Sequence, residues 1–290
     1  MSLPTWITVL IAVGSVLAVA CTADFVLSRF LRAPFKPAGK NCFITGGSTG
    51  LGKALAMQLA AAGADVCIVA RRESELKQAA EEIEASRRNE SQKVVYISAD
   101  VTSKEDVVRA FDEAKVKMGR NPDFQAAMRM RDSGIQGRIV FVSSMLGMLS
   151  FVGWATYAPT KYAVRGLADT LRNELKRYNI DVHIFFPGGI ESPGFDTENL
   201  TKPKVTKEIE GANTPQTSDE CAKSLLKGLY AGNYMIMTDF VSEILRTTVR
   251  GVSPTNNLIL DWALAIIGQP IASGYALYMD YAVKSLKEDE

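Results

Sequence analysis

Several features that would define a function are scarce in this 290-residue chain. Its one histidine, His183, lies in an apolar, strand-like context with no group of metal-ligating residues around it, so we predict a structural role and no metal site. The four cysteines have no paired spacing, which argues against a disulfide framework and fits a reducing compartment. They are Cys21, Cys42, Cys67 and Cys221. The net charge is only +1, and no repeat or basic–aromatic groove is visible, so the sequence indicates no nucleic-acid partner.

Charged residues are absent from residues 5–23, an apolar run nearly long enough to cross a bilayer core of about 30 Å. No basic residue precedes the run, unlike in a secretory signal peptide. Four basic residues follow it: Arg29, Arg32, Lys36 and Lys40. The positive-inside rule then places the basic side in the cytosol. We therefore predict a transmembrane anchor in residues 1–35, with a hairpin-like monotopic anchor or a signal sequence as alternatives.

A glycine-rich turn at residues 45–52 (TGGSTGLG) lies between two expected strands, residues 41–44 and 65–70. The expected helix over residues 53–62 connects the turn to the second strand. Glycines let the backbone turn tightly and approach a pyrophosphate, which then sits at the helix N-terminus. This order of strand, turn, helix and strand predicts a dinucleotide-binding unit.

Two arginines, Arg71 and Arg72, follow the second strand, where a carboxylate would bind the ribose of NAD. A guanidinium suits the additional 2′-phosphate of NADP instead. The alternative is a solvated basic loop balanced by Glu73 and Glu75. We favour NADP because of charge complementarity.

Residues 143–166 contain the residue types for proton transfer to a ketone. Tyr157 and Lys161 are four positions apart, which places them on one face of a helix. An ammonium beside a phenol favours the phenolate, and a tyrosine of lowered pKa can exchange a proton with an alcohol near neutral pH. Ser144 follows the expected strand at 138–142, where its hydroxyl could bind a carbonyl. The alternative is an ordinary solvated helix face.

Further expected strands and helices alternate along residues 36–250, which predicts one doubly wound α/β domain with a Rossmann-like parallel sheet and helices on both faces. The additional expected strands are residues 93–99, 138–142 and 181–186. The additional expected helices are residues 73–88, 103–118, 163–178 and 218–229.

The chain becomes apolar again from Asn257 to Val283. Asp261 and the Gly268-Gln269-Pro270 sequence argue against a simple spanning helix. We expect a re-entrant or interfacial segment, with its aromatic residues at headgroup depth. The alternatives are a buried helix pair or a homodimer contact. Residues 251–290 are therefore predicted to be a membrane-associated or dimerisation segment.

Together, residues 45–52, Asp100-Val101, Ser144, Tyr157 and Lys161 resemble the short-chain dehydrogenase/reductase family in order and spacing. The resemblance extends over about residues 39–232. Within the family, the chain is similar to members anchored in the endoplasmic reticulum membrane with a cytosolic catalytic domain, which use NADPH to reduce the 3-keto group of a long-chain sphingoid base. That narrower similarity rests on the anchor, on Arg71, and on residues 192–195 (SPGF) followed by 198–203 (ENLTKP).

This resemblance implies a role for each matched residue. Tyr157 would be the proton donor, Lys161 would lower its pKa and bind the nicotinamide ribose, and Ser144 would orient the carbonyl oxygen. The implied cofactor contacts are Gly46, Ser48, Thr49, Gly50 and Gly52 at the phosphates, Arg71 and Arg72 at the 2′-phosphate, Asp100 and Val101 at the adenine, and Pro187 and Gly188 at the nicotinamide. Glu75 stands where relatives can have a lysine contact to the phosphate. Residues 189–217 would form the mobile substrate loop.

One departure from the family is large. The family's fourth strand and most of the following helix are missing, with the junction near Gln125 and Ala126. The neighbouring strand must then leave a gap or shift by one strand spacing, about 4.8 Å. We expect the chain to be a splice product or mis-joined gene product of an active reductase. For the function, the alternatives to a reductase of a sphingoid base are a membrane-bound short-chain dehydrogenase that acts on a steroid or retinoid, and a catalytically inactive, membrane-anchored nucleotide-binding protein, which the missing strand would favour.

Overall fold

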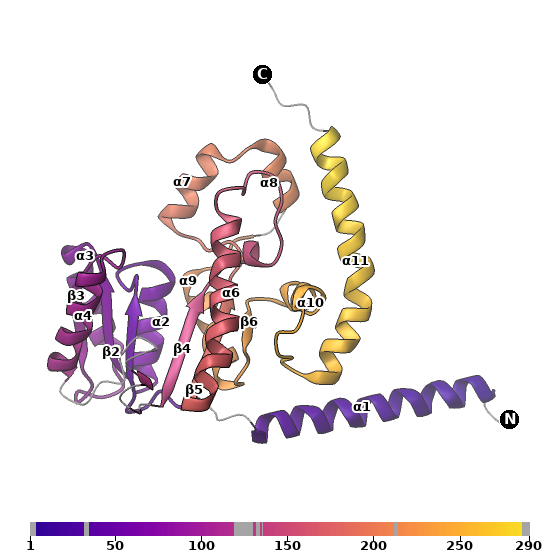
Figure 1. The fold of residues 1–290 in the computed structure, drawn as a ribbon, viewed down its shortest axis with the longest axis horizontal. Coiled ribbons are helices and arrows are strands. Elements are labelled where there is room, and N and C mark those ends of the chain that lie inside the picture. The colour runs from indigo at the N-terminus through magenta and orange to yellow at the C-terminus, as the bar shows by residue number, and fades with distance from the viewer. Residues whose placement is uncertain are drawn as a thin grey trace.

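The computed structural model describes residues 4–31, 35–118, 130–131, 134, 136–211 and 214–285. These residues form a doubly wound α/β domain with two long apolar helices beside it (Figure 1). The strands are β1 (Asn41–Thr45), β2 (Asp65–Ala70), β3 (Val94–Ser98), β4 (Gly137–Val142), β5 (Ile180–Phe186) and β6 (Met235–Met237). The helices are α1 (Thr5–Leu31), α2 (Gly50–Ala61), α3 (Glu73–Ala85), α4 (Lys104–Met118), α6 (Ala158–Leu175), α7 (Pro193–Thr201), α8 (Lys204–Glu210), α9 (Ser218–Tyr230), α10 (Phe240–Val249) and α11 (Leu258–Ser285).

The sheet is divided between β1 and β4. The strand orders are β1-β2-β3 and β4-β5-β6, with every pair parallel, and no ladder between described strands joins β1 to β4. The family resemblance places another strand between these two. A missing strand was expected either to leave a gap or to shift the neighbouring strand, and among the described strands the structure has the gap. The sequence junction at Gln125 and Ala126 lies outside the described residues.

Side-chain burial shows the same gap. Strand β2 is buried along nearly its whole length, whereas β1 and β4 are only half-buried and each ends exposed. A central strand of a doubly wound sheet is normally covered on both faces. At the open edge, Oδ1 of Asn41 is buried and has no hydrogen-bond partner in the described part of the chain.

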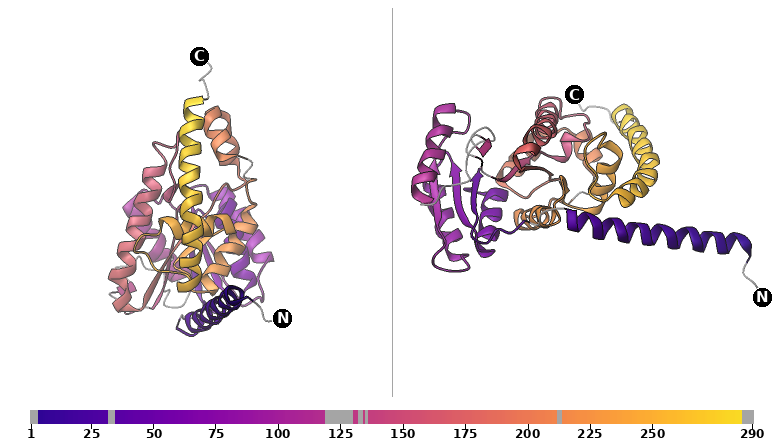
Figure 2. Two further views of the ribbon diagram at one scale, coloured as in Figure 1. Left: turned by 90° about the vertical axis from the view of Figure 1, so that its right-hand side faces the viewer. Right: turned by 60° about the horizontal axis from the view of Figure 1, so that its bottom comes forward.

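Helices cover both faces of the sheets, as the right-hand view of Figure 2 shows. On the face of α2, α3 and α9, one apolar core runs across both sheets and joins Ile68 of β2 and Phe185 of β5 to Leu225 of α9. On the opposite face the core has two separate parts, one packing Cys67 against α4 and the other packing Ile184 against α6. The missing crossover helix would lie between those parts, so α2 and α9 hold the two halves together.

The expected mobile loop at residues 189–217 is largely helical, which corrects the sequence-based expectation. It contains α7 and α8, and Ser192 caps α7 by accepting a hydrogen bond from the backbone N–H of Phe195 at 3.2 Å. Pro193 in the first helical turn is compatible with this start, because its missing N–H has no intrahelical partner there. We call α7, α8 and their connection, residues 193–210, the lid.

The expected break at Gly268-Gln269-Pro270 is also wrong, because α11 continues through Pro270 for 28 residues. Gly268 lets α11 cross α10 closely, since a Cβ there would lie only 2.6 Å from the side chain of Thr248. Asp261 is buried and makes a two-fold ion pair with Arg246 of α10, with N–O distances of 2.6 and 2.8 Å. Part of the predicted C-terminal segment therefore packs on the α/β domain.

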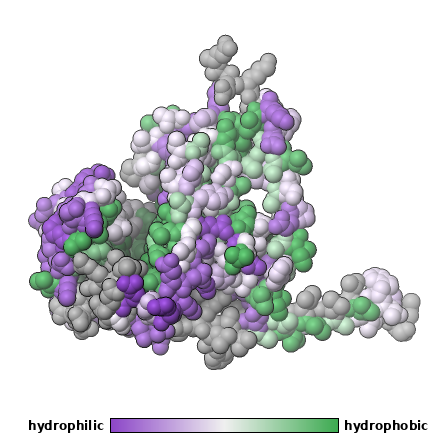
Figure 3. Space-filling view, viewed as in Figure 1, coloured by the Kyte–Doolittle hydropathy of each residue, from purple (hydrophilic) through white to green (hydrophobic). Residues whose placement is uncertain are grey.

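Apolar residues on α1 and α11 face outward, and Figure 3 shows them along both helices. Exposed examples are Trp6, Val16, Trp262, Ile266 and Leu277. Residues Thr5–Asp24 and Leu258–Ser285 are each long and apolar enough to cross a membrane. The two helices meet where Asp24 accepts a hydrogen bond from the backbone N–H of Ile259 at 3.2 Å.

Candidate active site

The glycine-rich turn has the predicted shape. Gly46 and Gly50 have positive φ angles of 69° and 55°, which favour glycine, and α2 begins at Gly50. A Cβ on Gly52 would lie 2.3 Å from the carbonyl oxygen of Gly46, so only glycine fits there. Nothing lies within 4 Å of the position of a Cβ on Gly46, which leaves room for a phosphate. The first backbone N–H groups of α2 have no partner within the helix and can donate to an anion. The turn therefore fits a pyrophosphate.

Arg71 and Asp100 lie near each other at the carboxyl ends of β2 and β3. Hydrogen bonds from the backbone and side chain of Thr102 lower the pKa of Asp100, and the charge of Arg71 adds to this effect. Arg72 differs, since its guanidinium pairs with Glu75 at 2.7 Å. Val101 is exposed beside Asp100. Arg71 is therefore the better placed of the two arginines for a 2′-phosphate.

Ser144, Tyr157 and Lys161 come together at the carboxyl end of β4. Tyr157 immediately precedes α6, and Lys161 lies one turn further, with its Nζ 5.2 Å from the centre of the Tyr157 ring. The side chains of Ser144 and Tyr157 are hydrogen-bonded. Tyr157 is 37% exposed, so part of this residue is open to solvent. The arrangement can place a donor and an ammonium next to a ketone oxygen.

The pKa of Tyr157 differs from the expectation. Burial raises the pKa of its phenol, the hydrogen bond with Ser144 opposes this, and the charge of Glu198 adds to the increase. Burial also lowers the pKa of Lys161. The expected lowering of the tyrosine pKa by Lys161 is therefore not seen, and the phenol stays protonated at neutral pH, as a proton donor requires.

Two hydrogen bonds to backbone carbonyls hold this group in place, and neither has a recognisable sequence pattern. Oγ of Ser143 donates a hydrogen bond to the carbonyl oxygen of Lys161 at 2.9 Å, which ties the end of β4 to α6. Pro187, after β5, accepts a hydrogen bond from the N–H of Met145 at 2.9 Å. Pro187 and the exposed Gly188 therefore lie beside the segment that carries Ser144.

The lid contacts the same group through residues that the sequence analysis did not single out. The ring of Trp154 lies 5.4 Å from that of Tyr157, and its Nε1 donates to Glu210 of α8 at 3.1 Å. Nζ of Lys202 lies 5.0 Å from the centre of the Trp154 ring. A buried lysine between aromatic rings is visible only once the fold brings the segments together.

The predicted site residues fall into two groups on different half-sheets. The phosphate turn, Arg71 and Asp100 belong to β1-β2-β3, whereas Ser144, Tyr157 and Lys161 belong to β4-β5-β6.

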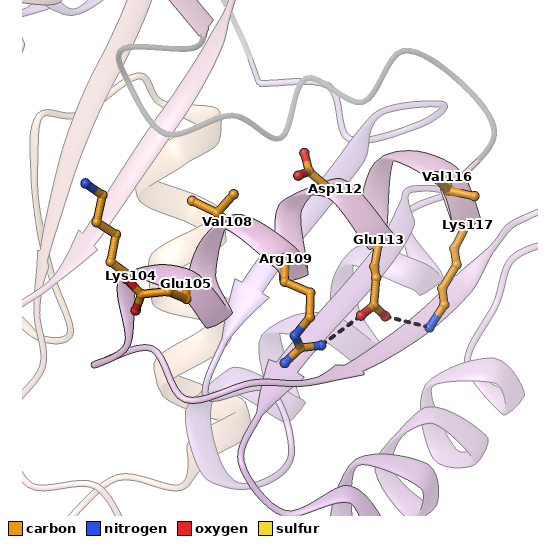
Figure 4. A pocket seen from close by; sticks show the side chains of 8 residues that line it. All are labelled: Lys104, Glu105, Val108, Arg109, Asp112, Glu113, Val116 and Lys117. Atoms are coloured by element: carbon orange, nitrogen blue, oxygen red, sulfur yellow. Dashed lines mark hydrogen bonds and ion pairs between the residues drawn. The ribbon is translucent and has the colours of Figure 1, made fainter.

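A surface hollow of about 740 Å³ lies elsewhere, along α4 (Figure 4). Its lining side chains all come from α4, between Lys104 and Lys117, and include none of the predicted site residues. Burial also raises the pKa of the thiols of Cys42 and Cys67 to about 12, so these residues belong to the core.

The fold and these motifs define a member of a known class. The short chain dehydrogenase family matches residues 40–121 and 124–203, and the chain belongs to this family of oxidoreductases. It is similar to a 3-ketodihydrosphingosine reductase of Cryptococcus neoformans, with 37% identity covering 93% of this chain and 94% of the relative. A 3-dehydrosphinganine reductase of Danio rerio is 31% identical over 78% of this chain and 79% of its own length.

Solved structures show the same fold at lower identity. A short chain dehydrogenase/reductase from Burkholderia phymatum in complex with NAD has a TM-score of 0.60, with 16% identity over 75% of this chain and 95% of that chain. Levodione reductase has a TM-score of 0.59, with 23% identity over 70% of this chain and 96% of that chain.

The alignment with the Cryptococcus relative is longer than this chain. It spans 320 positions, whereas 93% of 290 residues is about 270, so about 50 positions of the relative have no counterpart here. The family match is interrupted between residues 121 and 124, next to the predicted junction. Both observations agree with the gap between β1 and β4.

Proposed function

We propose that the protein is an NADPH-dependent reductase of the 3-keto group of 3-ketosphinganine, a long-chain sphingoid base. The observation that supports this is the grouping of Ser144, Tyr157 and Lys161 in a chain that is similar, along most of its length, to 3-ketodihydrosphingosine reductases. The apolar helices α1 and α11 suit a lipid substrate, and we place the protein in the endoplasmic reticulum membrane with its catalytic domain in the cytosol.

The chemistry requires a proton at the ketone oxygen. When bound, NADPH would supply a hydride to the carbonyl carbon. The hydroxyl of Ser144 orients the oxygen, and Tyr157 donates its phenolic proton to it, which gives the alcohol. The ammonium of Lys161 stabilises the phenolate that remains until solvent returns a proton. The residues of the phosphate turn and Arg71 would hold the cofactor.

The choice of cofactor can be tested at Arg71. We expect Arg71→Ser to raise the dissociation constant for NADPH by about tenfold or more, since a hydrogen bond to a charged group contributes about 1.5–3 kcal/mol. Binding of NADH should stay unchanged, because NADH has no 2′-phosphate. The measurement is cofactor fluorescence with the full chain in detergent.

Arg72→Ser is the matched control, and its effect should be smaller because Arg72 is already paired with Glu75. Equal weakening of NADPH and NADH binding by Arg71→Ser would contradict the assignment of Arg71 to the 2′-phosphate.

The substrate can be tested by direct assay. Full-length protein in phospholipid vesicles should oxidise NADPH with 3-ketosphinganine and form sphinganine, identified by mass spectrometry. A steroid ketone and retinal should give no comparable rate. Turnover of a steroid or retinoid in preference to the sphingoid base would overturn the proposed substrate.

The divided sheet favours a second candidate, a membrane-anchored nucleotide-binding protein without turnover. In that case the vesicle assay gives no product, although NADPH still binds at the phosphate turn. Product formation that is lost on removal of the Tyr157 hydroxyl would exclude this alternative.

A further inference from the structure

The lid carries a cluster of charges that packs against Trp154, next to the predicted proton donor. Nζ of Lys202 lies 2.8 Å from Glu198 and 2.7 Å from Glu210. It also lies 5.0 Å from the centre of the Trp154 ring and 5.2 Å from that of Phe195. The Lys202 side chain is only 3% exposed, so the cluster is a built part of the lid.

The cluster has more negative than positive charge. One ammonium, that of Lys202, stands between two carboxylates, which leaves one net negative charge among these three side chains. Hydrogen bonds to Glu198 and Glu210 raise the pKa of Lys202 although burial acts in the opposite direction, so the lysine remains charged. A further cation that reaches the cluster is therefore attracted to it.

The two carboxylates have different surroundings. Glu210 is fixed by Nε1 of Trp154 at 3.1 Å and by Lys202. Glu198 is 39% exposed, and Lys202 contacts its Oε1. Glu198 is connected to the proton donor by packing, because its partner Lys202 lies 5.0 Å from the ring of Trp154, and that ring lies 5.4 Å from the ring of Tyr157. The negative charge of Glu198 also adds to the raised pKa of Tyr157, of which burial is the main cause. A carboxylate has two oxygens and about four acceptor positions, so Glu198 can bind a second ammonium without releasing Lys202.

We propose that Glu198 binds the 2-ammonium group of an amino-ketone substrate, and this assignment rests on the proposed reductase function. In such a substrate the amine is on the carbon next to the ketone. A ketone oxygen bonded to Tyr157 therefore carries its ammonium into the region between Tyr157 and the lid. Glu198 then selects free sphingoid bases over lipids without a basic nitrogen at this position.

Binding can be tested without turnover through the fluorescence of Trp154, in a chain whose other two tryptophans, Trp6 and Trp262, are replaced by Phe and which serves as the wild-type background. The full chain in detergent micelles is titrated with sphinganine, which has the 2-amine, and with octadecane-1,3-diol, which lacks it. We expect the wild type to bind sphinganine at least tenfold more tightly. We expect Glu198→Gln to remove this preference, a change of about 1.4 kcal/mol for each tenfold, while its affinity for the diol stays the same.

The matched control is Glu208→Gln, which removes the same charge from an exposed position of the lid. It should keep the preference for the amine. We expect Glu198→Gln to fold, because Lys202 keeps Glu210 as its partner. Unchanged binding of the diol would show that it does. Comparing variants in the same micelles cancels differences in how the two lipids partition.

The outcomes separate this proposal from the reductase function. If Glu198→Gln keeps the amine preference, the role of Glu198 is overturned, whereas the reductase function is decided separately by the vesicle assay. If the wild type binds neither lipid, both fail. If the preference is lost as expected but the vesicle assay shows no turnover, Glu198 is confirmed as the amine-binding residue and catalysis by this chain fails.

Discussion

Insertion after Gln125 of the family's fourth strand and following helix, taken from the Cryptococcus relative, is expected to raise the NADPH-dependent reduction rate by at least about 10²-fold. The phosphate turn and the Ser144–Tyr157–Lys161 group are on separate half-sheets, joined on one face by the packing of α2 and α9. An added strand between β1 and β4 would fix their relative position through two hydrogen-bonded ladders. A misplacement of about 1 Å already costs about 10²-fold in rate.

The measurement is kcat/KM for 3-ketosphinganine, with both chains in the same vesicles. A Gly/Ser insert of equal length at the same position is the control, because it lengthens the connection without supplying a strand, and it should give no gain. Equal activity of the short and the long chain would show that the gap does not disturb the site, and would contradict our account of the missing strand.

Replacing Tyr157 by Phe is expected to lower kcat by about 10²–10⁴-fold, the usual contribution of a positioned proton donor. The substitution removes the hydroxyl that bonds Ser144 but keeps the ring that packs near Trp154. Binding of NADPH should change little. The strand-restored chain, if more active, gives the wider range for this measurement.

Tyr162→Phe is the matched control, since Tyr162 is an exposed residue of the same helix, and it should keep full activity. The pH profile gives a second readout. Burial raises the pKa of Tyr157, so the donor is protonated at neutral pH and is lost only as the pH rises through that raised pKa. An alkaline decline that persists unchanged in Tyr157→Phe would assign the proton to another group.

Local sequence patterns were enough to predict five of the six described strands, β1 to β5. The apolar run Asp65–Ala70 and the glycine-rich turn have short-range signals, and the structure has β2 and the start of α2 where they indicate. The four-residue spacing of Tyr157 and Lys161 is realised at the start of α6. The missing strand was also detectable, because an absent element changes the order of elements along the chain.

Features that depend on tertiary packing could not be predicted in this way. Proline inside a helix costs about 3 kcal/mol, yet α11 continues through Pro270 because Gln269 and Gly268 pack against α10. Strand β6 has only three residues, which is too few to show an alternating pattern. The helices of the lid were not predicted because its Pro, Gly and Thr content is typical of a loop. The contact of Lys202 with Trp154 joins segments that are distant in sequence.

The half-buried edges of β1 and β4 also concern the fate of the chain after synthesis. An open strand edge inside a sheet offers a row of backbone donors and acceptors to any extended segment, and such edges promote aggregation. Among the described residues, no strand pairs with this edge of β1 or of β4, and Ile44 and Phe141 in these strands are only partly buried. Chaperones and proteases bind chains that expose such surfaces, so the steady-state abundance of this chain in cells should be low compared with that of a relative with the complete sheet.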